Sequence, residues 1–219
     1  MDYEFSALVK FFPFFLPAAL MTIKITIAGI LMGLILGLLT AFCRISNNRL
    51  LNIPAGIYVY IIRGTPLLLQ LLFIYYGLRG LFGFEAFTSA FLGLGIHNGA
   101  YISEIFRGAI QSIALGQMEA ARSLGMTYQK AMVRIILPQA FKRAIPPLGN
   151  QFIIALKDSS LASAITINEL LLKSQQLYSA NFMMMEMLTV AALFYLLYTS
   201  IFTWMFNKIE EKLAVSGSR

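Results

Sequence analysis

Two acidic residues interrupt otherwise apolar stretches of the sequence. Glu104 follows an uncharged run from 86 to 103, and Asp158 follows the apolar run from 144 to 156. Ionisable side chains are costly inside a membrane, so residues in such positions are candidates for a functional site. An unpaired buried carboxylate is unstable and favours a partner of positive charge. We therefore expect Glu104 and Asp158 to attract a small molecule with net positive charge.

Neutral polar residues accompany both carboxylates. At about 100° per residue, Asn98, Tyr101 and Glu104 cover an arc of about 120° on one helix face. An amide, a phenol and a carboxylate suit a zwitterion that carries several hydrogen-bond donors. Further polar side chains flank Pro66 and follow Asp158. The predicted substrate-binding residues are Thr65, Gln70, Asn98, Tyr101, Glu104, Asp158 and Ser160.

Each charged candidate also has a purely structural interpretation. Glu104 could form a salt bridge with Arg107 one turn further along the helix. Asp158 could take part in a local or interhelical ion pair. Arg63 could meet a substrate carboxylate or lie at a lipid headgroup. Glu169 is expected at the outer surface.

The elements that must position these residues are membrane helices. The chain has 219 residues, of which 58% are hydrophobic and 12% charged, whereas a soluble domain carries about 25% charged residues. Helices satisfy their own backbone groups in lipid, and continuous apolar runs do not fit the alternation of a barrel. We predict an all-α integral membrane protein with one domain over 1–219 and five spans, at about 17–43, 53–78, 86–107, 134–157 and 187–207.

The net charge of +7 is explained by topology rather than by nucleic-acid binding. Most basic residues fall on one side if the N-terminus lies outside, and cytoplasmic loops are enriched in Lys and Arg. We therefore predict an outside N-terminus and an inside C-terminus. The residues assigned to the inner side are Arg44, Arg49, Arg107, Arg122, Lys130, Arg134, Lys142, Arg143, Lys208, Lys212 and Arg219.

Two features predict how the helices pack and bend. Gly29, Gly33 and Gly37 form a row of small residues that lets a second helix approach closely, either within the subunit or across a dimer. Gly64 and Pro66 predict a break in the second span at mid-depth, because proline removes a backbone donor. Broken helices are tolerated at membrane depth where they line a cavity.

The segment from about 115 to 130 is polar and lies between the third and fourth spans. Glu119, Ala120 and Ala121 belong to a predicted helix that ends at Gly125 in the left-handed conformation. Thr127 can cap a second helix that begins at Tyr128. This helix–turn–helix would present a cytoplasmic surface, either to another protein or to the lipid interface.

The same segment carries a recognisable pattern. Glu119-Ala120-Ala121 is followed by Gly125, Ile135 and Leu137-Pro138. At this spacing it resembles the EAA motif of binding-protein-dependent ABC importer permeases. The stretches Arg63 to Gln70 and Tyr75 to Leu78, together with those from Gly99 to Gln117 and from Lys157 to Leu161, are similar to sequences of the polar amino acid permeases. The resemblance extends from about Thr22 to Lys212.

The resemblance implies a type I importer permease fold and a set of partners. The ATPase-coupling residues would be Glu119, Ala120, Ala121, Gly125, Leu137 and Pro138. An ABC ATPase subunit would dock on them and bind ATP and Mg²⁺, while this chain would bind no cofactor of its own. An extracytoplasmic binding protein would deliver the amino acid. A second permease subunit would complete the pathway, with a homodimer favoured over a heterodimer.

The sequence also bears on catalysis. It contains no GxxxxGK[ST] loop for a nucleotide, so the chain is expected to be a transport subunit and not an enzyme. One cysteine, Cys43, and one histidine, His97, give little material for an intramembrane enzyme. With the resemblance, the two carboxylates favour an ATP-driven importer of basic amino acids, namely arginine, lysine or histidine. The alternatives kept open are an importer for glutamine, glutamate or cystine, and an ion-coupled secondary carrier.

Overall fold

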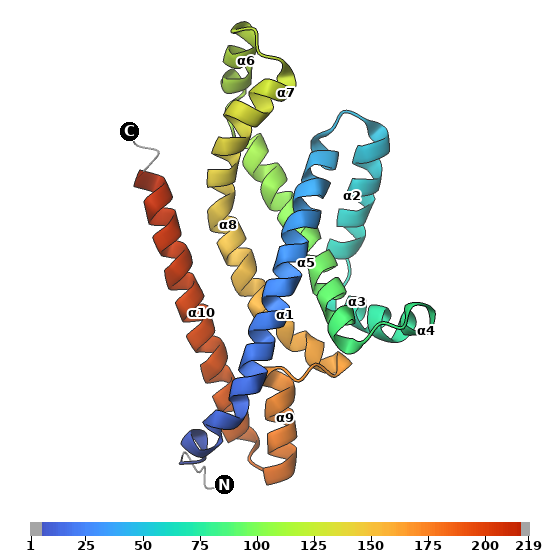
Figure 1. Ribbon diagram of the computed structural model, residues 1–219, viewed down its shortest axis with the longest axis vertical. Helices are drawn as coiled ribbons and strands as arrows, with labels where there is room; N and C mark the ends of the chain where they lie inside the picture. Colours follow the sequence, from blue (N-terminus) through green and yellow to red (C-terminus); the bar gives the residue numbers. More distant parts are fainter. Residues whose placement is uncertain (1–5, 216–219) are drawn as a thin grey trace.

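The computed structural model describes residues 6–215, and within this range every regular element is a helix (Figure 1). Arg219, assigned above to the inner side, lies outside the described residues. The α-helices are α1 (Ser6–Ile45), α2 (Arg49–Arg63), α3 (Leu67–Leu72), α4 (Arg79–Phe82), α5 (Ala86–Gln111), α6 (Leu115–Ser123), α7 (Tyr128–Ala131), α8 (Leu137–Asp158), α9 (Leu170–Asn181) and α10 (Met184–Val215). Two π-helical turns, η1 (Phe73–Gly77) and η2 (Met132–Ile136), and one 3₁₀ segment, η3 (Ser159–Ile165), join them.

The central contact of the fold joins α1 and α5, which lie side by side along much of their length (Figure 1). A Cβ atom on Gly29 would lie 2.8 Å from Cβ of Leu94, and one on Gly33 would lie 2.9 Å from Cβ of Asn98. A Cβ atom on Gly37 would meet α5 in the same way. Only glycine permits this approach, so the glycine row serves packing within the subunit.

The second predicted span is broken, as Gly64 and Pro66 indicated. Helix α2 ends at Arg63, α3 begins at Leu67, and the two helices bend by 105° between them. Pro66 takes an extended conformation at φ −64° and ψ 138°, which its ring favours and which cannot continue a helix. The break places Thr65 and Gln70 beside the interior of the bundle.

The predicted helix–turn–helix at the end of α5 is also observed. The left-handed Gly125, at φ +80°, donates its N–H to the carbonyl of Arg122, and Met126 donates to the carbonyl of Ala121. These two bonds make a Schellman ending for α6. Thr127 then caps α7 by accepting a hydrogen bond from the N–H of Lys130.

The segment between α8 and α10 differs from expectation at one residue. Glu169 was expected at the outer surface, but its side chain is fully buried. Its carboxylate caps α9 by accepting from the N–H groups of Leu171 and Leu172, and it accepts a third bond from Tyr195 of α10 at 2.8 Å. The local sequence shows the charge, but Tyr195, which covers it from α10, lies 26 residues further along the chain.

Within residues 6–215, two helices are long and apolar enough to cross a membrane, at Val9–Ile45 and Met184–Leu213. The bent pair of Arg49–Arg63 and Leu67–Gly77 makes a third if it counts as one span. Helices α5 and α8 reach 26 and 22 residues but do not meet the same test. Helix α5 is largely covered by α1 and α8, whereas α8 packs against α5 and α10 on one side only and is exposed on the other. A shielded helix can carry more polar residues than one that faces lipid on all sides.

Candidate functional site

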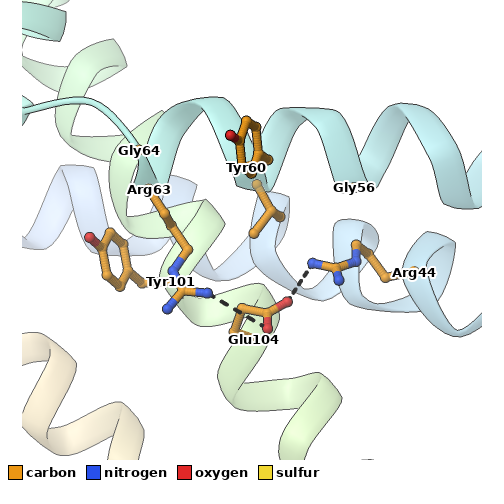
Figure 2. Close-up of a pocket in the computed structure, with 8 residues that line it drawn as sticks. Arg44, Gly56, Tyr60, Arg63, Gly64, Tyr101 and Glu104 are labelled. Atoms are coloured by element: carbon orange, nitrogen blue, oxygen red, sulfur yellow. Dashed lines mark hydrogen bonds and ion pairs between the residues drawn. The ribbon is translucent and has the colours of Figure 1, made fainter.

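A cavity of about 570 Å³ opens between α2 and α5, near the end of α1 (Figure 2). Glycine at positions 56 and 64 of the α2 side leaves the space open. The lining residues are Arg44, Gly56, Val59, Tyr60, Arg63, Gly64, Tyr101 and Glu104. Two of the predicted substrate residues, Tyr101 and Glu104, therefore share one cavity.

Three arginines surround the Glu104 carboxylate. Arg44 Nη1 lies 2.5 Å from Oε1, and Arg107 donates from Nη2 to Oε2 at 2.7 Å. Arg63 approaches from a third direction, with Nη1 3.7 Å from Oε2 (Figure 2). Of the two interpretations of Glu104, the salt bridge with Arg107 is present in the structure, and Arg44 adds a second ion pair. The sequence placed Arg44 at the inner side and gave no sign that it meets Glu104.

The side chains of Asn98, Tyr101 and Glu104, predicted to share one helix face, do not line the same surface. Asn98 is fully buried, and its amide bonds to the Leu94 carbonyl and to Gln151 of α8. An arc of about 120° is wide enough for one edge to face α8 while the other faces α2. Asn98 consequently does not line the cavity that contains Tyr101 and Glu104.

His97 lies beside Tyr101, although it does not itself line the cavity. Its ring centroid lies 5.0 Å from that of Tyr101, and its Nδ1 lies 3.2 Å from Oε1 of Gln70. Residues 97, 101 and 104 follow the spacing i, i+4, i+7, which defines a narrower helix stripe than 98, 101 and 104. That spacing was the signal in the sequence that could have identified His97.

Thr65 and Gln70 form one polar unit at the helix break. Gln70 Nε2 donates to Oγ1 of Thr65 at 2.9 Å and to the Ile62 carbonyl at 2.8 Å. Thr65 Oγ1 in turn donates to the Ile61 carbonyl. These bonds satisfy carbonyl groups that the break leaves without a helical donor. Gln70 contacts His97, and His97 contacts Tyr101, which lines the cavity. We call this row of contacts, Thr65–Gln70–His97–Tyr101, the polar stripe; it connects the helix break to the arginine cluster.

Asp158 and Ser160 lie where α8 gives way to η3, and η3 packs against α3. Both side chains are partly exposed. Among the residues that the structure describes, no cationic group lies within ion-pair distance of the Asp158 carboxylate. The charge of the neighbouring Lys157 acts on Asp158 from beyond ion-pair distance. Asp158, in contrast to Glu104, can therefore still form an ion pair with a cationic partner.

The segment that carries the EAA pattern presents only part of that pattern outward. Glu119 and Ala120 of α6 are exposed, whereas Ala121 is 3% exposed and packs inward. Of the expected coupling residues in α6, Glu119 and Ala120 are therefore accessible to a partner, and Ala121 is not. Leu137 and Pro138 begin α8, which continues directly from the π-helical turn η2, and Leu137 donates its N–H to the carbonyl of Met132.

Comparison with known proteins agrees with this architecture. Residues 29–215 match the family described as binding-protein-dependent transport system inner membrane component. The chain is 36% identical over 218 residues to the glutamine transport system permease protein GlnP of Escherichia coli, covering 98% of this chain and all of the relative. It is 37% identical over 215 residues to the arginine transport system permease protein ArtQ of Bacillus subtilis, covering 97% and 98%. A solved structure described as an amino acid ABC transporter with histidines superposes with a TM-score of 0.91 at 38% identity, covering 97% of this chain and 100% of that one.

The chain therefore belongs to the family of binding-protein-dependent inner membrane transport components. Within that family it is an ABC importer permease of the amino acid type, a multi-pass helical subunit of the inner membrane. Permeases of this family are transmembrane subunits without catalytic activity of their own. The family implies an ATPase and a substrate-binding protein as partners.

Proposed function

We propose that this permease imports polar amino acids with basic side chains by alternating access. The observation that carries the basic side chain is Asp158, whose carboxylate has no cation within ion-pair distance among residues 6–215. A carboxylate at the edge of a buried site is stabilised by an ammonium or guanidinium group of a ligand. Arginine, lysine and histidine are the proposed substrates.

The proposed substrate contacts divide into two groups. Thr65, Gln70, Tyr101, Asp158 and Ser160 would meet the amino acid directly, since their side chains lie along the helix break, the cavity and the α8–η3 junction. The remaining two candidates would act indirectly: Asn98 by joining α5 to α8, and Glu104 by holding the arginines around it.

The family supports a proposal for the assembly. We propose five spans with the N-terminus outside and the C-terminus inside, built from α1, the α2–η1 pair, α5, α8 and α10. The region from 115 to 130 would be the coupling segment, with the exposed Glu119 and Ala120 facing a cleft of the ATPase. ATP and Mg²⁺ would bind that partner. The second permease would be another copy of this chain, and a binding protein would deliver the substrate from outside.

Glutamine is the second candidate substrate, and the arginine cluster favours it. Because Arg44 and Arg107 neutralise Glu104, one of the two carboxylates that argued for a cationic ligand no longer does so. A neutral amino acid would leave Asp158 to receive only the α-ammonium group that all amino acids share.

Equilibrium binding of labelled arginine to the permease–ATPase complex distinguishes the two candidates. Lysine, histidine, glutamine and glutamate serve as unlabelled competitors. We expect arginine and lysine to compete best and Asp158→Asn to weaken arginine binding by about tenfold, or about 1.4 kcal/mol. Glu85→Gln, at an exposed carboxylate before α5, is the matched control and should leave the affinity unchanged. Competition by glutamine alone would overturn the basic substrate while leaving an amino acid importer.

A further inference from the structure

Arg63 is the least committed member of the arginine cluster. Its side chain is 44% exposed, and its nearest Glu104 oxygen is 3.7 Å away. Among the described residues, the guanidinium of Arg63 makes no hydrogen bond. It is held instead over the ring of Tyr101, with the guanidinium carbon 5.2 Å from the ring centroid. Stacking on Tyr101 thus orients the N–H groups of Arg63, which donate to no acceptor among the described residues.

Glu104 has little capacity left for Arg63. Arg44 donates to Oε1, and Arg107 donates from Nε to Oε1 and from Nη2 to Oε2. The cluster therefore holds three guanidinium groups against one carboxylate, and it has an excess of two positive charges. The open cavity in front of Arg63 is where an anion would offset that excess (Figure 2).

The anion that matches a guanidinium best is a planar group with two oxygens. A carboxylate accepts two parallel N–H bonds from arginine, a geometry that lysine cannot reproduce. Every amino acid carries such a group. The polar stripe from Thr65 and Gln70 through His97 to Tyr101 ends at the guanidinium of Arg63. A ligand bound at the helix break would therefore lie along the row of side chains that leads to Arg63.

We propose that Arg63 is the specificity residue that receives the α-carboxylate of the transported amino acid, and that Glu104 competes with the substrate for it. This inference rests on the proposed function, but it requires only an amino acid and not a basic one. At 3.7 Å, Glu104 attracts Arg63 without a hydrogen bond. A carboxylate ligand displaces this weak contact on arrival, and Glu104 recaptures Arg63 when the ligand leaves. Reversible exchange of this kind suits a transport site, where a ligand must be bound and then released.

The test compares amino acids with their α-carboxamides, which lack the negative charge but keep the side chain and the α-ammonium group. Arginine, arginine amide, glutamine and glutamine amide compete for binding to the permease–ATPase complex in detergent. In the wild type we expect each acid to bind at least tenfold more tightly than its amide. In Arg63→Gln the acid should lose about tenfold in affinity while the amide changes less than twofold, so the discrimination disappears. Arg63→Lys keeps the positive charge but lacks the two parallel N–H donors of a guanidinium. It should therefore recover only part of the discrimination between acid and amide.

Two further variants sharpen the test. Arg79→Gln removes another arginine that stacks on a tyrosine, since Arg79 lies over the ring of Tyr75 at 5.3 Å, but it lies outside the cavity and should leave the discrimination intact. Glu104→Gln removes the competitor and should tighten binding of the acid without tightening binding of the amide.

The outcomes separate this inference from the proposed substrate class. Discrimination that survives in Arg63→Gln overturns the inference, whichever amino acid binds. Glutamine binding without arginine binding overturns the basic substrate and leaves the inference standing if Arg63→Gln abolishes acid–amide discrimination. If Arg63→Gln instead abolishes only a dependence on added phosphatidylglycerol, Arg63 holds a lipid headgroup and the inference fails. Absence of binding by all four ligands overturns both.

Discussion

Arg44 and Glu104 are 60 positions apart in the sequence, yet Arg44 Nη1 and Glu104 Oε1 are 2.5 Å apart. The contact ties the last turn of α1 to α5 at the cavity. Their side chains are only 23% and 20% exposed, so solvent screens the pair less than it screens a surface pair. The contact is thus both a structural link between two helices and one wall of the candidate site.

This pair predicts a measurable coupling energy. A double-mutant cycle with Arg44→Gln and Glu104→Gln should give an interaction of about 1–3 kcal/mol in thermal unfolding of the detergent-purified subunit. The control is Lys208–Glu211 on α10, a 2.8 Å ion pair with both side chains more than half exposed, for which we expect about 0.5 kcal/mol or less. Equal coupling energies for the two pairs would contradict the structural role of Arg44.

The α1–α5 contact predicts different effects for two glycines. A Cβ on Gly37 would lie 2.6 Å from Cγ2 of Ile102 and 3.0 Å from the Gly99 carbonyl. Gly37→Ala should therefore destabilise the fold by about 1–3 kcal/mol through overpacking. Gly108→Ala, where nothing lies within 4 Å, should stabilise it by up to about 1 kcal/mol through helix propensity. Unfolding midpoints measure both, and a midpoint for Gly37→Ala at or above that of the wild type would refute the close contact.

Glu169 predicts a dependence of stability on pH. Burial raises the pKa of its carboxyl above the ordinary value of 4.5, and bonds from the backbone of Leu171 and Leu172 and from Tyr195 offset this only in part. The folded protein then keeps a proton that the unfolded chain has lost. The free energy of unfolding should fall as pH rises from about 4.5 to the raised pKa, and it should be constant above that.

The variant Glu169→Gln should remove this fall, because its amide does not titrate. Unfolding midpoints between pH 4.5 and neutral pH measure the difference from wild type. Glu85→Gln, at an exposed carboxylate, should keep the wild-type slope. An identical slope in wild type and Glu169→Gln would show that Glu169 does not titrate differently on folding.

The features that the sequence predicted well are those set within a few residues. The left-handed Gly125, the Thr127 cap and the break at Gly64 and Pro66 each follow from local backbone chemistry. The glycine row was visible too, but not its partner helix. The pairing of Glu104 with Arg44 and the covering of Glu169 by Tyr195 depend on helices distant in the sequence. Charges that meet only in space leave no local pattern in the sequence. The pairing of Glu104 with Arg44 and Arg107 therefore removes Glu104 as an argument for a cationic substrate, and the argument from Asp158 remains.

The exposed surface of α6 predicts that transport and ATP hydrolysis can be uncoupled. Gly125→Val places a β-branched residue at φ +80°, which costs about 1–2 kcal/mol and should fray the Schellman ending that fixes α6. Glu119→Lys reverses the charge on the exposed side of the same helix. In liposomes that contain the permease and its ATPase, both variants should lower uptake by about tenfold while ATP hydrolysis continues and the permease still binds substrate. Gly125→Asn is the matched control, since asparagine tolerates the left-handed conformation better than valine, and it should keep most of the uptake. Wild-type uptake in both Gly125→Val and Glu119→Lys would remove the coupling role of α6.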